Sequence, residues 1–157
     1  MQKITTFLWF DGQAETAANF YVSIFKSSKI TGVTRYGDAG PGPKGSVMTV
    51  AFQLDGQEFV ALNGGPEFKF TEAISLVVNC ESQREVDEMW DKLTAGGKPG
   101  QCGWLKDKFG LSWQVTAKAM SKMLKEGTPE QVSRLTKAFL PMKKFDLAAL
   151  EKAYQGS

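Results

Sequence analysis

The sequence offers few side chains that could carry acid–base, nucleophilic or metal chemistry. Its 157 residues contain no histidine. Histidine titrates near neutral pH, is the commonest metal ligand, and is the usual base beside a nucleophilic serine or cysteine. The composition therefore excludes Ser-His and Cys-His nucleophilic pairs and the H-E-x-x-H zinc proteases.

Two cysteines remain as candidates for nucleophilic or redox chemistry. Cys80 and Cys102 lie in apolar or glycine-rich surroundings and lack the C-x-x-C spacing of redox motifs. Two reduced structural thiols are the simpler interpretation, and a redox pair or a catalytic nucleophile is the alternative.

Side chains suited to ligand contact lie on two predicted hairpins. In the first, strands Ser46–Leu54 and Gln57–Asn63 flank Asp55-Gly56, a strong signal for a two-residue turn. That turn predicts three facing pairs, which are Phe52 with Phe59, Val50 with Ala61, and Met48 with Asn63. Both faces of this hairpin are largely apolar. We therefore expect one face to pack on a helix and the other to close a cavity or an interface.

The second hairpin separates apolar from polar side chains more clearly. Its strands are predicted at Gln101–Lys106 and Leu111–Thr116. Alternation along the second strand places Leu111, Trp113 and Val115 on one face and Ser112, Gln114 and Thr116 on the other. An apolar wall that faces hydroxyls and an amide has the composition of a small-molecule pocket. Polar side chains that simply face solvent are the equal alternative.

A strand and a helix precede the first hairpin. Strand Lys3–Phe10 ends at Asp11-Gly12, and strand Lys29–Tyr36 follows the helix. The helix is predicted from an apolar stripe at i, i+3, i+4, i+7 and i+8, formed by Ala17, Phe20, Tyr21, Ile24 and Phe25.

The same order of elements recurs in the second half. Strand Ala73–Asn79 precedes a helix that begins at the capping-box sequence Ser82–Glu85, and Gly96–Gly100 is predicted as a loop. The stripe of the second helix is Val86, Met89, Trp90 and Leu93. This recurrence predicts a degenerate internal duplication, and so an α+β fold of paired βαβββ modules.

Helices are predicted to complete the chain. Thr128 is an N-cap followed by a proline at the first helical position, and Asp146 caps a later helix. Their apolar stripe is Val132, Leu135, Phe139, Leu147, Leu150 and Tyr154. We expect one domain, with a first module at 1–66, a second module at 67–117 and a C-terminal helical extension at 118–157.

Charge and hydropathy argue against nucleic acid and membranes as binding partners. The formal net charge is +2, with acidic and basic residues interspersed, so there is no basic stripe for nucleic acid. No apolar run approaches the 18 or so residues that span a bilayer, and the apolar N-terminus lacks a signal-peptide cleavage pattern. We expect a cytoplasmic protein that binds neither nucleic acid nor membrane.

Several sequence motifs resemble those of a known superfamily. They are LWFDG from Leu8, NFYVSIF from Asn19, RYGDAGPGPKGSVMT from Arg35, FQLDGQEFVALNGGPEFKFTEAISLVVNC from Phe52 and CGWLKDKFGLSWQV from Cys102. In these motifs and in its order of elements the chain resembles the vicinal-oxygen-chelate superfamily of glyoxalases, bleomycin-resistance proteins and extradiol dioxygenases. The likeness is greater to its PhnB-like branch, whose members are often labelled 3-demethylubiquinone-9 3-methyltransferase.

The resemblance implies four metal-ligand positions, which fall near Thr5, Ala61, Ala73 and Gln114. Of these only Gln114 is a plausible ligand, and Zn, Fe and Ni prefer imidazole, thiolate or carboxylate. We therefore expect no catalytic metal. The first strand–helix turn has a single glycine, so we also expect no S-adenosylmethionine site, and we predict no cofactor.

The best reading is a homodimer that binds a small organic molecule and whose catalytic activity is uncertain. The predicted ligand contacts are Trp9, Met48, Phe52, Phe59, Asn63, Trp104 and Gln114; Trp9 is included because the resemblance places it on the same face as Thr5. The alternatives are a group-transfer enzyme, as the methyltransferase label suggests, and a non-catalytic sequestering protein of the bleomycin-resistance type. Whether the modules pair within one chain or across a dimer stays open.

Overall fold

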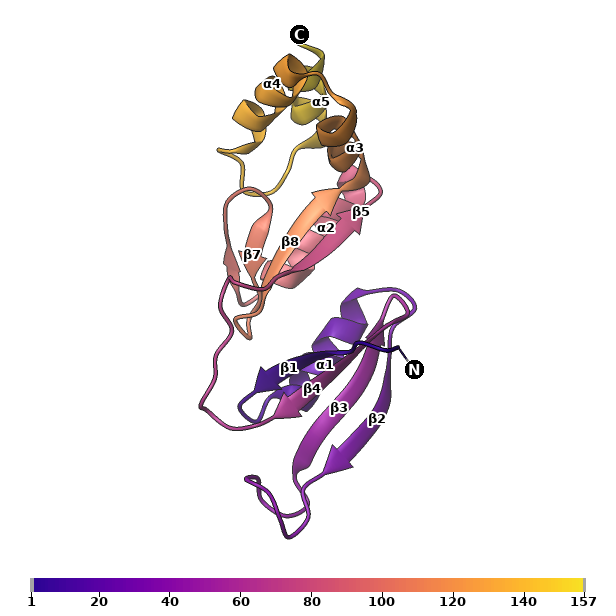
Figure 1. Cartoon of the computed structure of the whole chain (residues 1–157), viewed down its shortest axis with the longest axis vertical. Coiled ribbons are helices and arrows are strands. Elements are labelled where there is room, and N and C mark those ends of the chain that lie inside the picture. Colours follow the sequence, from indigo (N-terminus) through magenta and orange to yellow (C-terminus); the bar gives the residue numbers. More distant parts are fainter. Residues whose placement is uncertain (1, 157) are drawn as a thin grey trace. The chain divides into compact units, whose positions relative to one another are not determined.

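The structure is a computed structural model that describes residues 2–156. The chain divides into two compact units, Met1–Phe70 and Thr71–Ser157. Each unit contains a four-stranded sheet with a helix on one face (Figure 1).

The first unit has the order strand, helix, strand, strand, strand. Its elements are β1 (Thr6–Phe10), α1 (Ala14–Ile24), β2 (Lys29–Arg35), β3 (Val47–Leu54) and β4 (Gln57–Asn63). The strands lie side by side in the order β1-β4-β3-β2, with β1 parallel to β4 and the other pairs antiparallel. The Asp55-Gly56 turn gives the predicted register, because Phe52 pairs with Phe59 and Val50 pairs with Ala61.

The second unit repeats this order and adds three helices. Its elements are β5 (Leu76–Cys80), α2 (Gln83–Thr94), β6 (Lys98–Pro99), β7 (Trp104–Lys106), β8 (Ser112–Ala117), α3 (Lys118–Glu126), α4 (Pro129–Phe139) and α5 (Leu147–Gln155). The sheet order is β5-β8-β7-β6, again with the outer first strand parallel to the last strand. The two sheets have the same topology, which confirms the α+β fold of duplicated βαβββ modules.

Three elements of the second unit differ from the sequence prediction. Strand β5 begins at Leu76 instead of Ala73. Lys98–Pro99 was predicted as loop but forms the short strand β6, which pairs with Lys106 and Leu105 of β7. Strand β7 begins at Trp104 instead of Gln101, because Cys102 and Gly103 have positive φ angles of 57° and 80°. The N–H groups of these two residues donate to Met142 and Lys143 carbonyls instead of extending the strand.

The core of the first unit lies between α1 and the sheet. Tyr21 of α1 stacks on Phe52 with ring centroids 6.2 Å apart, and Phe52 stacks on Phe59 at 5.5 Å. All three side chains are buried. Burial of an apolar side chain of this size contributes about 2 kcal/mol to the free energy of folding. The stack therefore stabilises the packing of α1 on this face of the sheet.

In the second unit α2 covers the corresponding face. Val86, Trp90 and Leu93 are buried, as the helical stripe predicted, and they occupy the spacing of Ala17, Tyr21 and Ile24 in α1. Trp113 of β8 is also buried, and its indole N–H donates to the Asp107 carboxylate over 2.8 Å.

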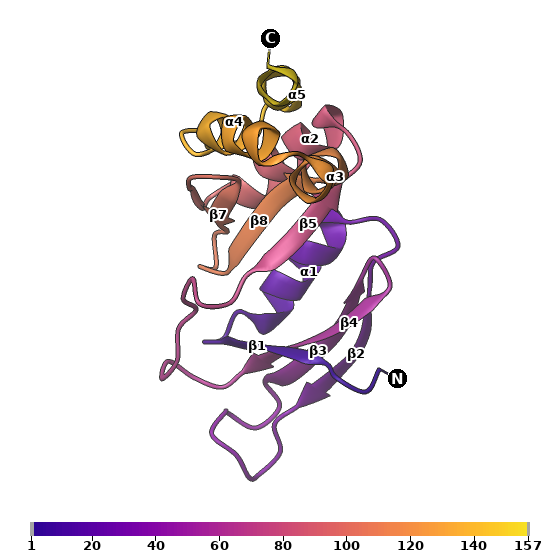
Figure 2. The ribbon, with the colours of Figure 1, turned by 45° about the horizontal axis from the view of Figure 1, so that its top comes forward.

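The terminal helices gather at one end of the second sheet (Figure 2). Their core consists of Met120, Met123, Leu135, Phe145 and Leu150, with Phe139, Leu147 and Tyr154 packed against it. The apolar stripe predicted for the terminal helices is therefore buried or half-buried within its own chain. It is covered because α4 and α5 pack against each other and, through α3, against the sheet.

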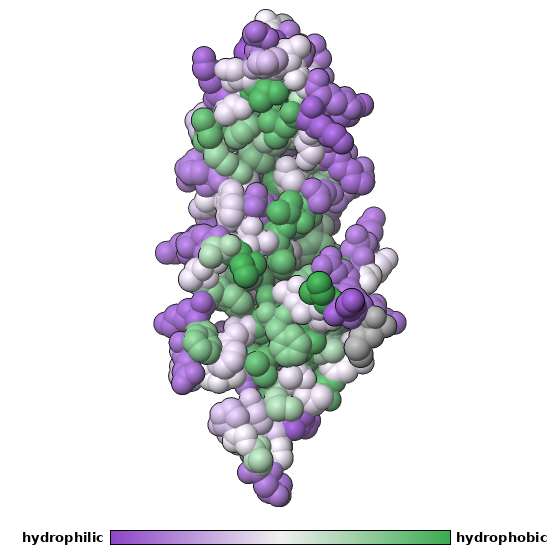
Figure 3. Space-filling view, viewed as in Figure 1, coloured by the Kyte–Doolittle hydropathy of each residue, from purple (hydrophilic) through white to green (hydrophobic). Residues whose placement is uncertain are grey.

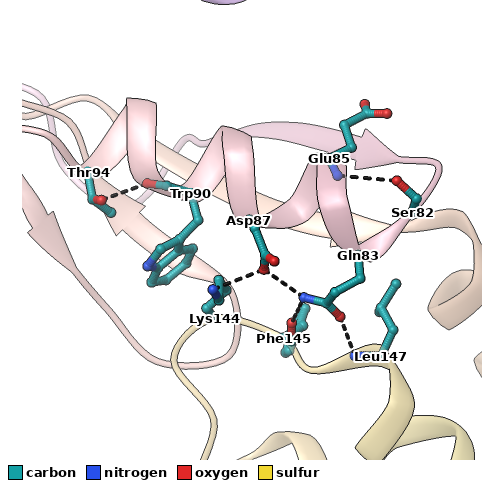
Figure 4. A network of polar contacts seen from close by, with 9 residues as sticks. All are labelled: Ser82, Gln83, Glu85, Asp87, Trp90, Thr94, Lys144, Phe145 and Leu147. Atoms are coloured by element: carbon teal, nitrogen blue, oxygen red, sulfur yellow. Dashed lines mark hydrogen bonds and ion pairs between the residues drawn. The ribbon is translucent and has the colours of Figure 1, made fainter.

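Gln83 joins the start of α2 to the segment before α5. Its Nε2 donates to Asp87 Oδ1 and to the Phe145 carbonyl, each over 2.9 Å, and its Oε1 accepts from Leu147 N–H over 2.7 Å. Lys144 forms an ion pair with Asp87 at 2.9 Å (Figure 4).

Among residues 2–156, no helix combines the length and hydropathy needed to cross a bilayer.

Candidate functional site

Each sheet has one face that its helix does not cover, and we call these the helix-free faces. On the first sheet, one row across the strands is Trp9, Leu62 and Thr49, and the next row is Phe7, Val60 and Ala51. Apolar side chains gather over β1 and β4 on this face (Figure 3). Phe7 is 60% exposed and the others are half-buried. A sheet face that met only water would carry polar side chains, so this face is suited to contact with an apolar ligand or partner.

Trp9 is held in a fixed orientation on this face. Its indole N–H donates to the Gly65 carbonyl over 2.9 Å, and the edge of its ring system meets Phe68 at a centroid distance of 4.9 Å. A Cβ atom on Gly64 would lie 2.3 Å from the indole ring. The Gly-Gly pair after β4 therefore serves to seat Trp9, a role that the sequence pattern alone did not reveal.

Four of the predicted ligand contacts lie elsewhere in the first unit. Phe52 and Phe59 belong to the core beneath α1, and strand alternation places Met48 and Asn63 on the same side. These four residues are not on the helix-free face with Trp9. The prediction grouped them because both faces of the hairpin are apolar, and only the position of α1 distinguishes them.

Asn63 is engaged within the fold. Its Oδ1 accepts from Ala14 N–H over 2.9 Å, and its Nδ2 donates to the Val47 carbonyl over 3.1 Å. The Tyr36 hydroxyl donates to the Asn63 carbonyl. These contacts join β4, the start of α1 and the ends of β2 and β3.

Trp104 and Gln114 do come together, on the helix-free face of the second sheet. They are direct partners in the β7–β8 register. Both are half-buried, and Gln114 Nε2 donates to the Ser75 hydroxyl over 3.0 Å. This face has more polar side chains than its counterpart in the first unit, as the alternation of β8 predicted.

A pocket of about 290 Å³ opens beside Trp104. It is lined by Glu72, Lys98, Pro99, Gly100, Trp104, Leu105, Lys106 and Ser112. Three of these side chains form one row across the sheet, because Lys98 pairs with Lys106 and Lys106 pairs with Ser112. Sequence reasoning missed this row because β6 was predicted as loop.

Some polar side chains of the pocket have an ion-pair or hydrogen-bond partner within the protein, and one does not. Glu72 and Lys106 form an ion pair, and the hydrogen bond from Lys106 lowers the pKa of the Glu72 carboxyl from its ordinary value. Ser112 is only 1% exposed, and its hydroxyl has no hydrogen-bond partner within the described residues. A buried hydroxyl without a partner is uncommon in a folded protein and indicates a place for an additional polar atom.

The residues at the positions implied for a metal do not fit one. Ala61 is fully buried on the α1 side, and its neighbours on the helix-free face are Val60 and Leu62. Ala73 likewise offers no donor atom. Residues 2–156 contain no group of three or more cysteine, aspartate or glutamate side chains placed to hold a metal ion. The donor set is therefore unsuited to a transition metal.

Residues 2–116 match the family model described as 3-demethylubiquinone-9 3-methyltransferase. The chain belongs to this family. The matched part comprises both βαβββ modules and ends in β8, so the helices α3, α4 and α5 follow it as an extension. None of the curated proteins matches the chain.

Solved structures show that this chain is PhnB-like and that other proteins share its fold. A PhnB protein from Bacillus cereus is 44% identical over 74% of this chain and 99% of its own, with a TM-score of 0.68. Protein PA1353 of Pseudomonas aeruginosa is 18% identical, covers 74% of this chain and 98% of its own, and has a TM-score of 0.62. The fosfomycin resistance protein FosX of Listeria monocytogenes, in complex with Mn(II) and sulfate, is 16% identical over 80% and 98%, with a TM-score of 0.54. At 18% and 16% identity, the last two structures show a shared fold and nothing more.

Proposed function

We propose that this PhnB-like protein binds a small organic molecule on its helix-free sheet faces and does so without a catalytic metal. The observation that carries the proposal is that α1 and α2 each cover one face, while the other face presents a tryptophan among half-buried side chains. Trp9 and Trp104 supply flat apolar surfaces, and Gln114 supplies a polar group that can orient a ligand. Apolar walls with a few polar groups are typical of small-molecule sites.

Metal-dependent chemistry is not part of this proposal, because alanine stands at two of the four implied ligand positions, Ala61 and Ala73, and Gln114 alone cannot hold a transition metal. Elemental analysis of chelator-washed protein is expected to find no stoichiometric Zn, Ni, Fe or Mn. About one such ion per chain, retained after washing, would contradict the proposal.

Methyl transfer, the activity in the family's description, is the second candidate. The two sheets are mixed, and the only parallel neighbours are β1 with β4 and β5 with β8 within the described residues. Nucleotide-type cofactors are typically bound at a glycine-rich turn in an open parallel sheet. We therefore expect no saturable binding of S-adenosylmethionine in calorimetric titration, and micromolar binding would favour the methyltransferase instead.

The protein is further proposed to be a homodimer. The support is the helix-free faces, where Phe7 and Val77 remain exposed. Large exposed apolar patches are uncommon on monomers, and a second copy would cover them. Light scattering is expected to give twice the 17.3 kDa chain mass, and a concentration-independent mass of one chain would contradict the dimer.

The ligand itself is tested by mass spectrometry of protein purified without added ligand. We expect a small organic molecule to be detected under native conditions and released on denaturation. Trp9→Leu should reduce its retention and also lower the thermal midpoint, because Trp9 loses its hydrogen bond to the Gly65 carbonyl and its contact with Phe68. Phe20→Leu, at a half-buried position of α1 away from the helix-free face, is the matched control and should retain the ligand. Equal retention by the two variants would place the ligand elsewhere.

A further inference from the structure

We propose that the pocket beside β6, β7 and β8 takes a small organic monoanion, a carboxylate on a compact apolar or aromatic body. This inference rests on the proposed function, since it names the class of ligand for the helix-free face of the second unit. It is argued from the charge of the pocket, from the Ser112 hydroxyl and from the walls.

The charges in the pocket leave one positive charge uncompensated. Lys98 and Lys106 face each other directly across β6 and β7, an arrangement in which like charges repel. Glu72 pairs with Lys106, whereas none of the ion pairs formed by the described residues includes Lys98. Two ammonium groups and one carboxylate give a net charge of +1 at neutral pH. A ligand with a single negative charge would complement this arrangement.

The Ser112 hydroxyl supplies the orienting contact. It lies next to Lys106 in the row, is buried, and lacks a partner. The residues before and after Ser112 are both anchored to Asp107, because Leu111 N–H and the Trp113 indole N–H donate to its carboxylate. These contacts hold the backbone of Ser112 in place. A carboxylate oxygen of the ligand would accept a hydrogen bond from this hydroxyl, and such charge-assisted bonds are stronger than neutral ones.

The walls limit the size and kind of the ligand body. Pro99, Trp104 and Leu105 supply apolar surface, and Gly100 leaves no room for a Cβ atom, which would lie 2.8 Å from the Trp104 carbonyl oxygen. A volume of about 290 Å³ is at the lower end of the range for ligand sites. The pocket can therefore hold a compact body such as a single aromatic ring.

Benzoate is the probe, and benzamide is its neutral isostere. Binding to the full chain is measured by calorimetry, with amide chemical shifts to locate the site. We expect Ser112→Ala and Lys98→Gln each to weaken benzoate binding about ten-fold. Glu72→Gln should strengthen benzoate binding several-fold, because it releases Lys106 from its ion pair. Benzamide should bind more weakly than benzoate and should not respond to Lys98→Gln.

Matched controls are Ser133→Ala and Lys125→Gln, which are exposed positions on α4 and α3 outside the pocket. Both should bind benzoate as the unaltered chain does. Ser112→Ala should keep or raise the thermal midpoint, because it removes an unpaired buried hydroxyl.

Three outcomes of the benzoate titrations would overturn the inference. They are equal benzoate affinity in the pocket variants and the controls, equal affinity for benzamide and benzoate, and shift changes centred on Trp9 instead of Lys98 and Ser112. A copurified neutral molecule that depends on Trp9 would overturn this inference and leave the proposed function intact. Absence of any copurified or titrated small molecule would overturn both.

Discussion

Asn63 Oδ1 accepts a hydrogen bond from the backbone N–H of Ala14 over 2.9 Å, so the last residue of β4 caps the first turn of α1. The helix otherwise lacks a side-chain cap, because Gln13 at its N-cap position makes no such bond. The residue that seemed suited to ligand contact thus stabilises the βαβββ module itself. This relationship connects two positions 49 residues apart in the sequence.

The first prediction concerns this cap. Asn63→Ala should lower the free energy of unfolding by about 2 kcal/mol, because the Ala14 N–H and the Val47 carbonyl both lose a part-buried partner. Chemical denaturation measures this change. Asn19→Ala is the matched control on the exposed side of α1 and should leave stability within about 0.5 kcal/mol. Equal effects of the two substitutions would contradict the capping role.

A second prediction concerns the Gln83 contacts in Figure 4. Gln83→Ala should cost about 2 kcal/mol, because the Phe145 carbonyl and the Leu147 N–H lose their side-chain partner. Hydrogen exchange should accelerate at residues 145–150 and remain unchanged in the first unit. Gln155→Ala, which removes an exposed hydrogen bond to Glu151, should alter neither quantity. Unchanged exchange at the start of α5 in Gln83→Ala would refute the prediction.

The pH dependence of stability provides a third prediction. The hydrogen bond from Gln83, and then the one from Lys144, lower the pKa of Asp87 from its ordinary value of 3.8. Since the folded-state pKa lies below the unfolded one, the contribution to stability is complete well above 3.8. It is lost as the pH falls through the folded-state pKa.

Asp87→Asn should therefore flatten the dependence of the unfolding free energy on pH below about 5, compared with the unaltered chain. Denaturation curves recorded between pH 6 and the acid limit of reversibility test this. Asp91→Asn, an exposed position on the same helix, serves as the control. If both variants followed the same pH curve, the contacts of Asp87 would have no role in acid stability.

The fourth prediction concerns the thiols. Cys80 is fully buried, and this burial raises the pKa of its thiol to about 12. At pH 8 its thiolate is scarce and inaccessible, so Cys80 should react with a disulfide reagent about a hundred-fold more slowly in the folded chain than in denaturant. Cys80→Ala should leave the fast-reacting thiol count unchanged, whereas Cys102→Ala should remove any fast phase. A fast phase that disappears in Cys80→Ala would contradict the buried position.

Local signals in the sequence determined most of the secondary structure. The Asp55-Gly56 turn set the register of β3 and β4, and the caps Thr128 and Asp146 set the starts of α4 and α5. The helical stripes identified the buried faces of α1 and α2. These features depend on interactions between residues within a few positions of one another, so they can be recognised from the sequence.

The candidate site was only partly predictable. The alternation along β8 was predicted, because strand alternation is a local rule, but the pairing of Trp104 with Gln114 on one face was not. Phe52 and Phe59 were assigned to the ligand side, since the sequence cannot tell which of two apolar faces receives a helix. The structure places α1 on them.

Tertiary structure alone decided the features that depend on distant pairing. The two-residue strand β6 exists because β7 offers it an edge, and that pairing brings Lys98, Lys106 and Ser112 into one row. The cap that Asn63 provides for Ala14 likewise requires β4 to lie beside β1. Side-chain types and local turns determined the helices and strands. The pairing of distant strands determined which side chains lie next to Lys98, Ser112 and Asn63.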